Sequence, residues 1–140
     1  MRAYHALVLG AVVLTMATLA HAGTSAGTSA GTSLRVTYWE DGANKNASVT
    51  WVLRCNPARG TLPRPARACR KLAAGGSKLF APIPLDSVCT EIYGGPQRGR
   101  AVGTVGGKQV WATFSRQNGC HIGRWNRLSP WLLPPGGVAS

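Results

Sequence analysis

The sequence contains few acidic residues and few histidines, and these shortages exclude most kinds of catalytic site. Its 140 residues include only 4 Asp and Glu against 16 Lys and Arg, and only 3 His. After residue 33 the single histidine is His121, and the acids Glu40 and Asp41 adjoin in a predicted turn. A triad of His121, Asp86 and a serine lacks the Gly-x-Ser-x-Gly motif that marks many nucleophiles. The sequence therefore predicts a protein that is not an enzyme.

The four cysteines lack the close spacing of metal ligands. There is no Cys-x-x-Cys pair, and His121 is the one histidine after residue 33 that could join a cysteine at a metal site. Structural zinc sites are usually built from such close pairs, so we expect no metal and no other cofactor. Four cysteines in an oxidising compartment favour two disulfides instead. Three pairings exist, and the residues alone do not choose among them.

The N-terminal segment has the pattern of a secretory signal peptide. Arg2 precedes an apolar run from Ala6 to Ala20, and Ala20-His21-Ala22 fits a cleavage site. The run has about 15 residues, whereas a membrane-spanning helix needs roughly 20. We therefore predict that residues 1–22 are removed on export. The product would be a secreted, extracellular protein with no membrane segment.

The rest of the chain divides by composition into three parts. Residues 23–33 repeat Gly-Thr-Ser-Ala, and such small polar residues are typical of a flexible linker. Residues 34–128 carry the apolar patterning and are assigned to one folded domain. Residues 129–140 are rich in proline and glycine and are assigned to a C-terminal tail.

Hydrophobic periodicity predicts an antiparallel sheet with two short helices. Four segments show the alternation of half-buried strands, namely 34–38, 49–53, 101–105 and 109–114. Turn-forming residues 41–46 separate the first pair, and Gly106-Gly107 separates the second pair. Helices are expected over residues 65–72, which begin with a proline, and after Asn118-Gly119. The predicted fold class is therefore α+β.

Four bulky aromatic residues lie on the predicted strands or directly after one of them. We expect Trp39, Trp51, Trp111 and Phe114 to pack in the core or against a sheet face. Trp131, Leu132 and Leu133 lie between Pro130 and Pro134, and proline interrupts strand pairing. A regular C-terminal strand is therefore not expected there. One interpretation is that this Trp-Leu-Leu run is exposed as a contact between subunits.

Several short motifs together resemble those of a known family. They are Leu53-Arg54-Cys55-Asn56-Pro57, Gly60-Thr61-Leu62-Pro63, Ala68-Cys69-Arg70-Lys71-Leu72, Val88-Cys89-Thr90-Glu91-Ile92-Tyr93 and Asn118-Gly119-Cys120. Over about residues 34–126 the chain resembles the Streptomyces subtilisin inhibitor family of secreted serine-protease inhibitors. The resemblance implies the disulfides Cys55–Cys69 and Cys89–Cys120 and a five-stranded antiparallel sheet with two helices. It also implies a homodimer formed between sheets.

The resemblance further implies a reactive loop that begins just after Cys89. In the family the scissile bond lies between the second and third residues beyond this cysteine, which here are Glu91 and Ile92. The implied protease-contact residues are Val88, Cys89, Thr90 and Tyr93. Asn118 matches an asparagine whose side chain braces the loop. The chain is thus expected to be a substrate-like, reversible inhibitor.

Glu91 limits which proteases such a loop can fit. A carboxylate that enters an apolar pocket without a partner costs several kcal/mol or takes up a proton. The expected target is therefore a Glu-preferring serine endopeptidase, or a subtilisin-like enzyme whose open pocket leaves the carboxylate hydrated. The opposing interpretation is that Glu91 is a solvated loop residue and that tight inhibition has been lost.

The basic residues suggest an alternative function. One group surrounds the first two cysteines and another follows the loop, namely Arg59, Arg64, Arg67, Arg70 and Lys71, then Arg98, Arg100, Arg116, Arg124 and Arg127. Such a solvated field speeds association with an acidic protease. It also fits a non-inhibitory extracellular binding module for anionic polymers. No aromatic stacking platform is evident between these residues in the sequence, so we expect no specific nucleic-acid partner.

Overall fold

The structure is a computed structural model of the chain and describes residues 30–42 and 45–136. The predicted signal peptide, residues 1–22, and the repeat up to residue 29 lie outside the described residues. Within these ranges no helix has the length and apolar character needed to cross a bilayer.

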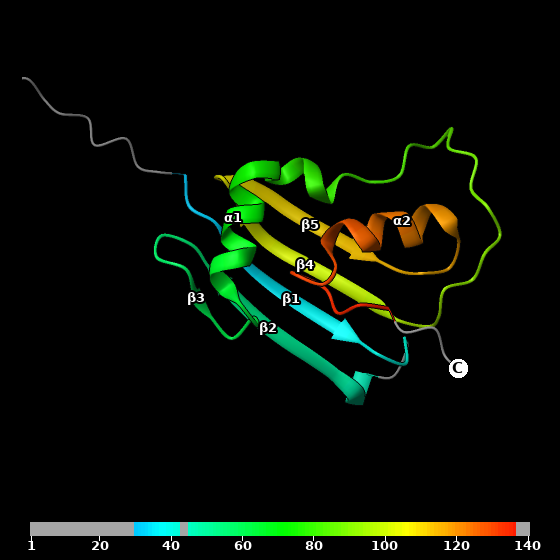
Figure 1. Ribbon diagram of the computed structural model, residues 1–140, viewed down its shortest axis with the longest axis horizontal. Helices are drawn as coiled ribbons and strands as arrows, with labels where there is room; N and C mark the ends of the chain where they lie inside the picture. The colour runs from blue at the N-terminus through cyan, green and yellow to red at the C-terminus, as the bar shows by residue number, and fades with distance from the viewer. Residues whose placement is uncertain (1–29, 43–44, 137–140) are drawn as a thin grey trace, which may run out of the picture.

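A single antiparallel sheet forms the centre of the structure (Figure 1). Its five strands are β1 (Ser33–Trp39), β2 (Ser48–Arg54), β3 (Arg59–Gly60), β4 (Arg98–Val105) and β5 (Lys108–Phe114). They lie in the order β3-β2-β1-β4-β5. Strand β1 is paired along its whole length with β2 on one side and β4 on the other. The predicted α+β class and both predicted hairpins are confirmed.

The pairing begins within the Gly-Thr-Ser-Ala repeat. Ser33 is the first residue of β1, and hydrogen bonds continue upstream of it. Cys55 N donates to Thr32 O at 3.0 Å, and Gly107 N donates to Gly31 O at 3.1 Å. The last residues of the repeat are therefore hydrogen-bonded to the residue after β2 on one side and to the turn between β4 and β5 on the other.

The described part of the chain also contains two α-helices and two short 3-10 helices. Helix α1 (Pro65–Gly75) starts at the predicted proline and extends three residues beyond the predicted end, and α2 (Gly119–Leu128) follows Asn118 as expected. The 3-10 turns are η1 (Lys45–Ala47) and η2 (Gly76–Phe80). In Figure 1 both α-helices lie over the same face of the sheet. Among residues 30–42 and 45–136, no helix lies over the opposite face of the sheet.

The core lies between the sheet and the two helices. Alternate strand residues point into it, such as Leu34 and Val36 of β1 and Ala101 and Val105 of β4. Each helix adds its own apolar stripe, including Leu72 of α1 and Trp125 and Leu128 of α2. Trp51 and Phe114 belong to this layer or pack against it, as predicted. Trp111 lies on the uncovered face instead and is 72% exposed.

The C-terminal Trp-Leu-Leu run is part of the core, so the interpretation as an exposed subunit contact is wrong. Trp131, Leu132 and Leu133 are all buried. The chain turns back after α2 because Leu132 N and Leu133 N both donate to Leu128 O. The indole nitrogen of Trp131 then donates to Arg127 O at 3.0 Å. The prolines around the run end the helix, but they do not keep these side chains in solvent.

The disulfide Cys55–Cys69 joins the end of β2 to α1, as the resemblance implied. It lies against the core cluster and holds α1 close to the edge of the sheet. A small domain buries a limited share of its surface, and a covalent link that lowers the conformational entropy of the unfolded chain adds stability.

Two leucine substitutions test the placement of the C-terminal run. Leu133 is 1% exposed and Leu85 is fully exposed. Leu133→Ala removes a buried side chain, so we expect a loss of about 2–5 kcal/mol in the free energy of unfolding. Leu85→Ala is the matched control and should change it by less than about 0.5 kcal/mol. Urea unfolding of the oxidised protein measures both, and equal effects would contradict the buried C-terminal run.

Candidate functional site

Four of the six large apolar side chains that are exposed among the described residues lie on one long loop. Residues 81–97 connect η2 to β4 and contain no helix or strand. In Figure 1 this loop runs around the outside of α2 before it returns to the sheet. Its exposed apolar residues are Leu85, Val88, Ile92 and Tyr93. An exposed apolar group of this kind on a loop indicates a surface for contact with another protein.

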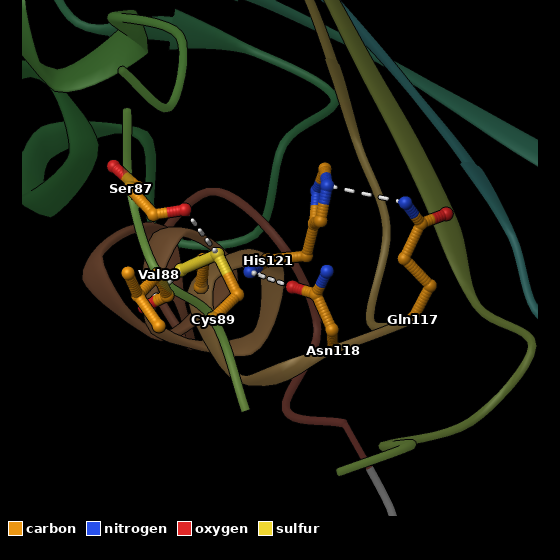
Figure 2. The surroundings of a disulfide bond; sticks show 7 residues. Ser87, Val88, Cys89, Gln117, Asn118 and His121 are labelled. Atoms are coloured by element: carbon orange, nitrogen blue, oxygen red, sulfur yellow. Dashed lines mark hydrogen bonds between the residues drawn. A yellow bond between two sulfur atoms is a disulfide. The ribbon is translucent and has the colours of Figure 1, made fainter. Parts of the chain in front are cut away.

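The loop is joined covalently to α2 by the disulfide Cys89–Cys120. The pairing implied by the resemblance is therefore confirmed. Figure 2 shows this disulfide beside Val88 and the start of α2. One residue further, Thr90 O accepts a hydrogen bond of 2.9 Å from Gly119 N. A Cβ atom at Gly119 would lie only 2.0 Å from the hydroxyl of Thr90, so a side chain at this position would displace that hydroxyl.

Arg124 fixes the start of the loop. This residue of α2 is 7% exposed, and its guanidinium donates three hydrogen bonds to backbone oxygens. Nε donates to Ala81 O at 2.8 Å and one Nη donates to Phe80 O at 2.9 Å. The other Nη donates to Thr113 O of β5. Burial and then the nearby charge of Arg127 lower the pKa of Arg124. Arginine side chains lose their proton only far above neutral pH, so Arg124 remains a cation. The cation therefore ties the loop entrance to both α2 and β5.

Arg116 fixes the other end of the loop. It follows β5 and is 6% exposed. Its Nε donates to Gly94 O at 2.9 Å, and Gly94 N donates to Arg116 O at 2.7 Å. The guanidinium carbon lies 6.0 Å from the ring centroid of Trp125. The exposed part of the loop is therefore held between two buried arginines.

Asn118 organises the helix to which the loop is bound. Its Oδ1 accepts a hydrogen bond of 3.1 Å from His121 N, which caps the first turn of α2. Figure 2 shows this bond and a second one between the side chains of Gln117 and His121, at 3.2 Å. Burial and then the charge of Arg124 lower the pKa of His121, which favours the neutral ring at neutral pH. The hydrogen bond seen for the Asn118 side chain therefore goes to α2 rather than to the loop, and its bracing role stays a prediction.

Glu91 and Ile92 lie at the exposed part of the loop, between Cys89 and Gly94. Both side chains are exposed. Within the described residues no hydrogen bond or ion pair holds the Glu91 carboxylate. The peptide between them is therefore presented to solvent while the chain on either side of it is fixed to α2 and to the residues after β5.

The site displays a segment of chain and does not assemble reactive groups. Within the described ranges, no group of three or more His, Cys, Asp or Glu residues could hold a metal ion. A cavity of about 860 Å³ is lined by Trp39, Arg98, Arg100 and Phe114 among others, and by none of residues 81–97. What this geometry offers is therefore a rigid, exposed peptide for recognition.

Arg116 and Arg124 are buried, so the prediction that they belong to a solvated basic surface is wrong for both. Their charges are met by main-chain carbonyl oxygens in the interior. For Arg124 a signal existed in the sequence. Leu128 lies four residues further along α2, so the two side chains share one face of the helix, and Leu128 belongs to the buried stripe. No comparable periodic signal marks Arg116.

The chain is a small protein in which a five-stranded sheet presents one disulfide-anchored, exposed loop, a form suited to recognition by another protein. The profile of the subtilisin inhibitor-like family matches residues 28–118, and the chain belongs to that family. Members of this family are protease inhibitors and not enzymes.

Among solved structures, the chain is similar to Streptomyces caespitosus sermetstatin, determined in complex with Bacillus licheniformis subtilisin. The sequences are 24% identical, the match covers 74% of this chain and 97% of that chain, and the TM-score is 0.48. None of the curated proteins matched the chain.

The role of Arg116 can be tested without any partner protein. Arg116→Gln removes the charged donor to Gly94 O, and a hydrogen bond to a charged group contributes about 1.5–3 kcal/mol. We therefore expect the amide of Gly94 to exchange with solvent about tenfold faster or more, as measured by NMR hydrogen exchange. Arg127→Gln removes the same charge from an exposed position on α2 and should leave this rate unchanged. An unaltered Gly94 rate in Arg116→Gln would contradict the bracing role.

Proposed function

We propose that this chain is a secreted, substrate-like inhibitor of a serine endopeptidase, and that its reactive bond joins Glu91 to Ile92. The observation that supports this most directly is the exposed peptide held at both ends, by the Cys89–Cys120 disulfide and by Arg116. Membership of the subtilisin inhibitor-like family supports the same class of function. The signal-peptide pattern of residues 1–22 supports an extracellular site of action.

A protease binds its substrate as an extended strand that adds to a strand of the enzyme. Val88, Cys89 and Thr90 would occupy the acyl-side subsites and supply main-chain hydrogen bonds. Glu91 would enter the primary specificity pocket, and Tyr93 would contact the leaving side. Val88 is 98% exposed, so its side chain is available to a subsite without rearrangement of the domain.

The rigidity of the loop favours tight binding over hydrolysis. A flexible peptide loses conformational entropy when it docks, whereas this loop is already ordered by its disulfide and its buried arginines. If the bond is cut, Gly94 stays bonded to Arg116 through two hydrogen bonds. The new amine of Ile92, two residues away, would therefore remain beside the acyl-enzyme. It can attack the ester carbonyl, which reforms the peptide and releases the enzyme serine.

The Glu91 side chain sets the class of target. Its carboxylate is exposed and has no hydrogen-bond or ion-pair partner among the described residues, so no intramolecular contact must break when it enters a pocket. A Glu-preferring serine endopeptidase offers that carboxylate a polar partner. A subtilisin-like enzyme fits when its pocket is open enough to leave the carboxylate hydrated, because burial without a partner is costly.

Titration against two proteases tests the proposal. The oxidised protein is added in increasing amounts to a subtilisin and to a Glu-specific serine endopeptidase, and residual activity is measured. We expect an equimolar amount to abolish the activity of at least one enzyme. Mass spectrometry should then show little cleavage, with any cut between Glu91 and Ile92. Full activity of both enzymes, or cleavage elsewhere in the loop, would overturn the proposal.

Glu91→Met tests the position of the reactive bond. Removal of the carboxylate avoids its desolvation in an apolar pocket, so inhibition of a broad subtilisin should strengthen by about tenfold or more. Inhibition of a Glu-specific endopeptidase should weaken. Asp86→Asn removes one negative charge from the same loop outside the specificity pocket and should leave both constants nearly unchanged. Equal effects of the two substitutions would mean that Glu91 acts through charge alone.

A further inference from the structure

The sheet face turned away from the helices carries exposed arginines and no acid. Leu34 and Val36 point into the core, so Arg35 between them points to the other face, and the strand register places the corresponding residues of the neighbouring strands there. The exposed arginines of this face are Arg35, Arg54, Arg59, Arg98 and Arg100. The four acids of the chain all lie outside the strands. We call this surface the arginine face.

The arginines form a stripe that crosses the sheet diagonally. Arg59 of β3 is directly opposite Arg54 of β2. Arg35 of β1 is opposite Val52 and Val102, so Arg54 and Arg100 are its diagonal neighbours, at about 7–8 Å. Like charges in direct cross-strand opposition destabilise a sheet. A linear polyanion laid along the stripe would remove that repulsion.

Two tryptophans lie beside the stripe. The guanidinium carbon of Arg100 lies 5.6 Å from the ring centroid of Trp39 and 5.9 Å from that of Trp111. Trp111 leaves most of its ring surface to solvent. Trp39, Arg98, Arg100 and Thr113 also line the cavity of about 860 Å³ described above. The sheet thus brings together the cations and aromatic rings that lie far apart in the sequence.

We propose that the arginine face binds single-stranded nucleic acid without sequence preference. Arginines that follow the backbone and exposed rings on which bases stack are the two elements of such sites. The phosphates would lie along Arg54, Arg35 and Arg100, and a base would stack on Trp111. The homodimer between sheets that the resemblance implies would fit this face poorly, because two sets of arginines would meet there without a carboxylate. The proposal does not rest on protease inhibition, since the loop lies outside this face.

The first test is binding of the oxidised protein to a labelled oligothymidylate of about 20 nucleotides, followed by fluorescence anisotropy at several salt concentrations. Each phosphate contact contributes about −0.7 to the slope of log K against log salt. Arg35→Gln with Arg54→Gln should therefore reduce the slope by about 1.4. Arg70→Gln with Lys71→Gln removes the same charge from exposed positions on α1 and should leave the slope unchanged.

The second test separates stacking from charge. Trp111→Thr keeps a residue that favours strands, and it should weaken oligothymidylate binding about fivefold or more because one stacked base is lost. Binding of inorganic polyphosphate, which has no ring to stack, should not change. Equal binding of heparin and oligothymidylate, an equal effect of the α1 variant, or no binding would each overturn the proposal. A homodimer seen by sedimentation velocity and dissociated by Trp111→Thr would also overturn it, because the face would then be covered by a second copy. Protease inhibition by the same variants is measured in a separate titration, because it tests the loop and not the arginine face.

Discussion

The hydrogen bonds from two buried arginines to main-chain oxygens are the constraint on which the rest of this structure depends. Arg124 holds the entrance of the loop against α2 and β5, and Arg116 holds its exit. A buried cation is costly unless its donors are satisfied, and here the acceptors are carbonyl groups. The same contacts that satisfy the cations therefore fix the path of a loop of 17 residues, which has no secondary structure of its own.

The C-terminal Trp-Leu-Leu run and the residues after it pack against α2 and β4, next to the anchored loop. Trp125 of α2 lies near Arg116 and donates from its indole nitrogen to Pro134 O at 2.9 Å. Leu133 packs so closely on β4 that a Cβ atom at Gly99 would lie 2.9 Å from its Cδ2. Residues after α2 therefore complete the core beneath the helix that carries Cys120. The loop, α2 and the C-terminal run are consequently one mechanical unit.

The sequence was most informative where one physical rule dominated. Apolar alternation predicted the hairpins, and Pro65 and Asn118-Gly119 predicted both helix starts, because these are local effects. The disulfide pairing and the loop position came from family resemblance, since spacing alone left three pairings. The buried arginines and the buried Trp-Leu-Leu run were missed. A charge or a proline in the sequence does not reveal its environment, and in both cases tertiary packing decided the outcome. The arginine face likewise becomes visible only when the strand register brings Arg54, Arg35 and Arg100 together.

The bonds that hold the loop are made largely to atoms that every amino acid possesses. Phe80, Ala81, Thr90 and Gly94 all take part through their main-chain groups, and only Cys89 contributes a side chain to the covalent anchor. The frame is thus indifferent to the identity of Leu85, Val88, Glu91 or Ile92. Under selection, or in a combinatorial library, these residues can be replaced while the frame that presents them is kept. A single scaffold of this kind could therefore diversify its recognition of partners without first having to find a new fold.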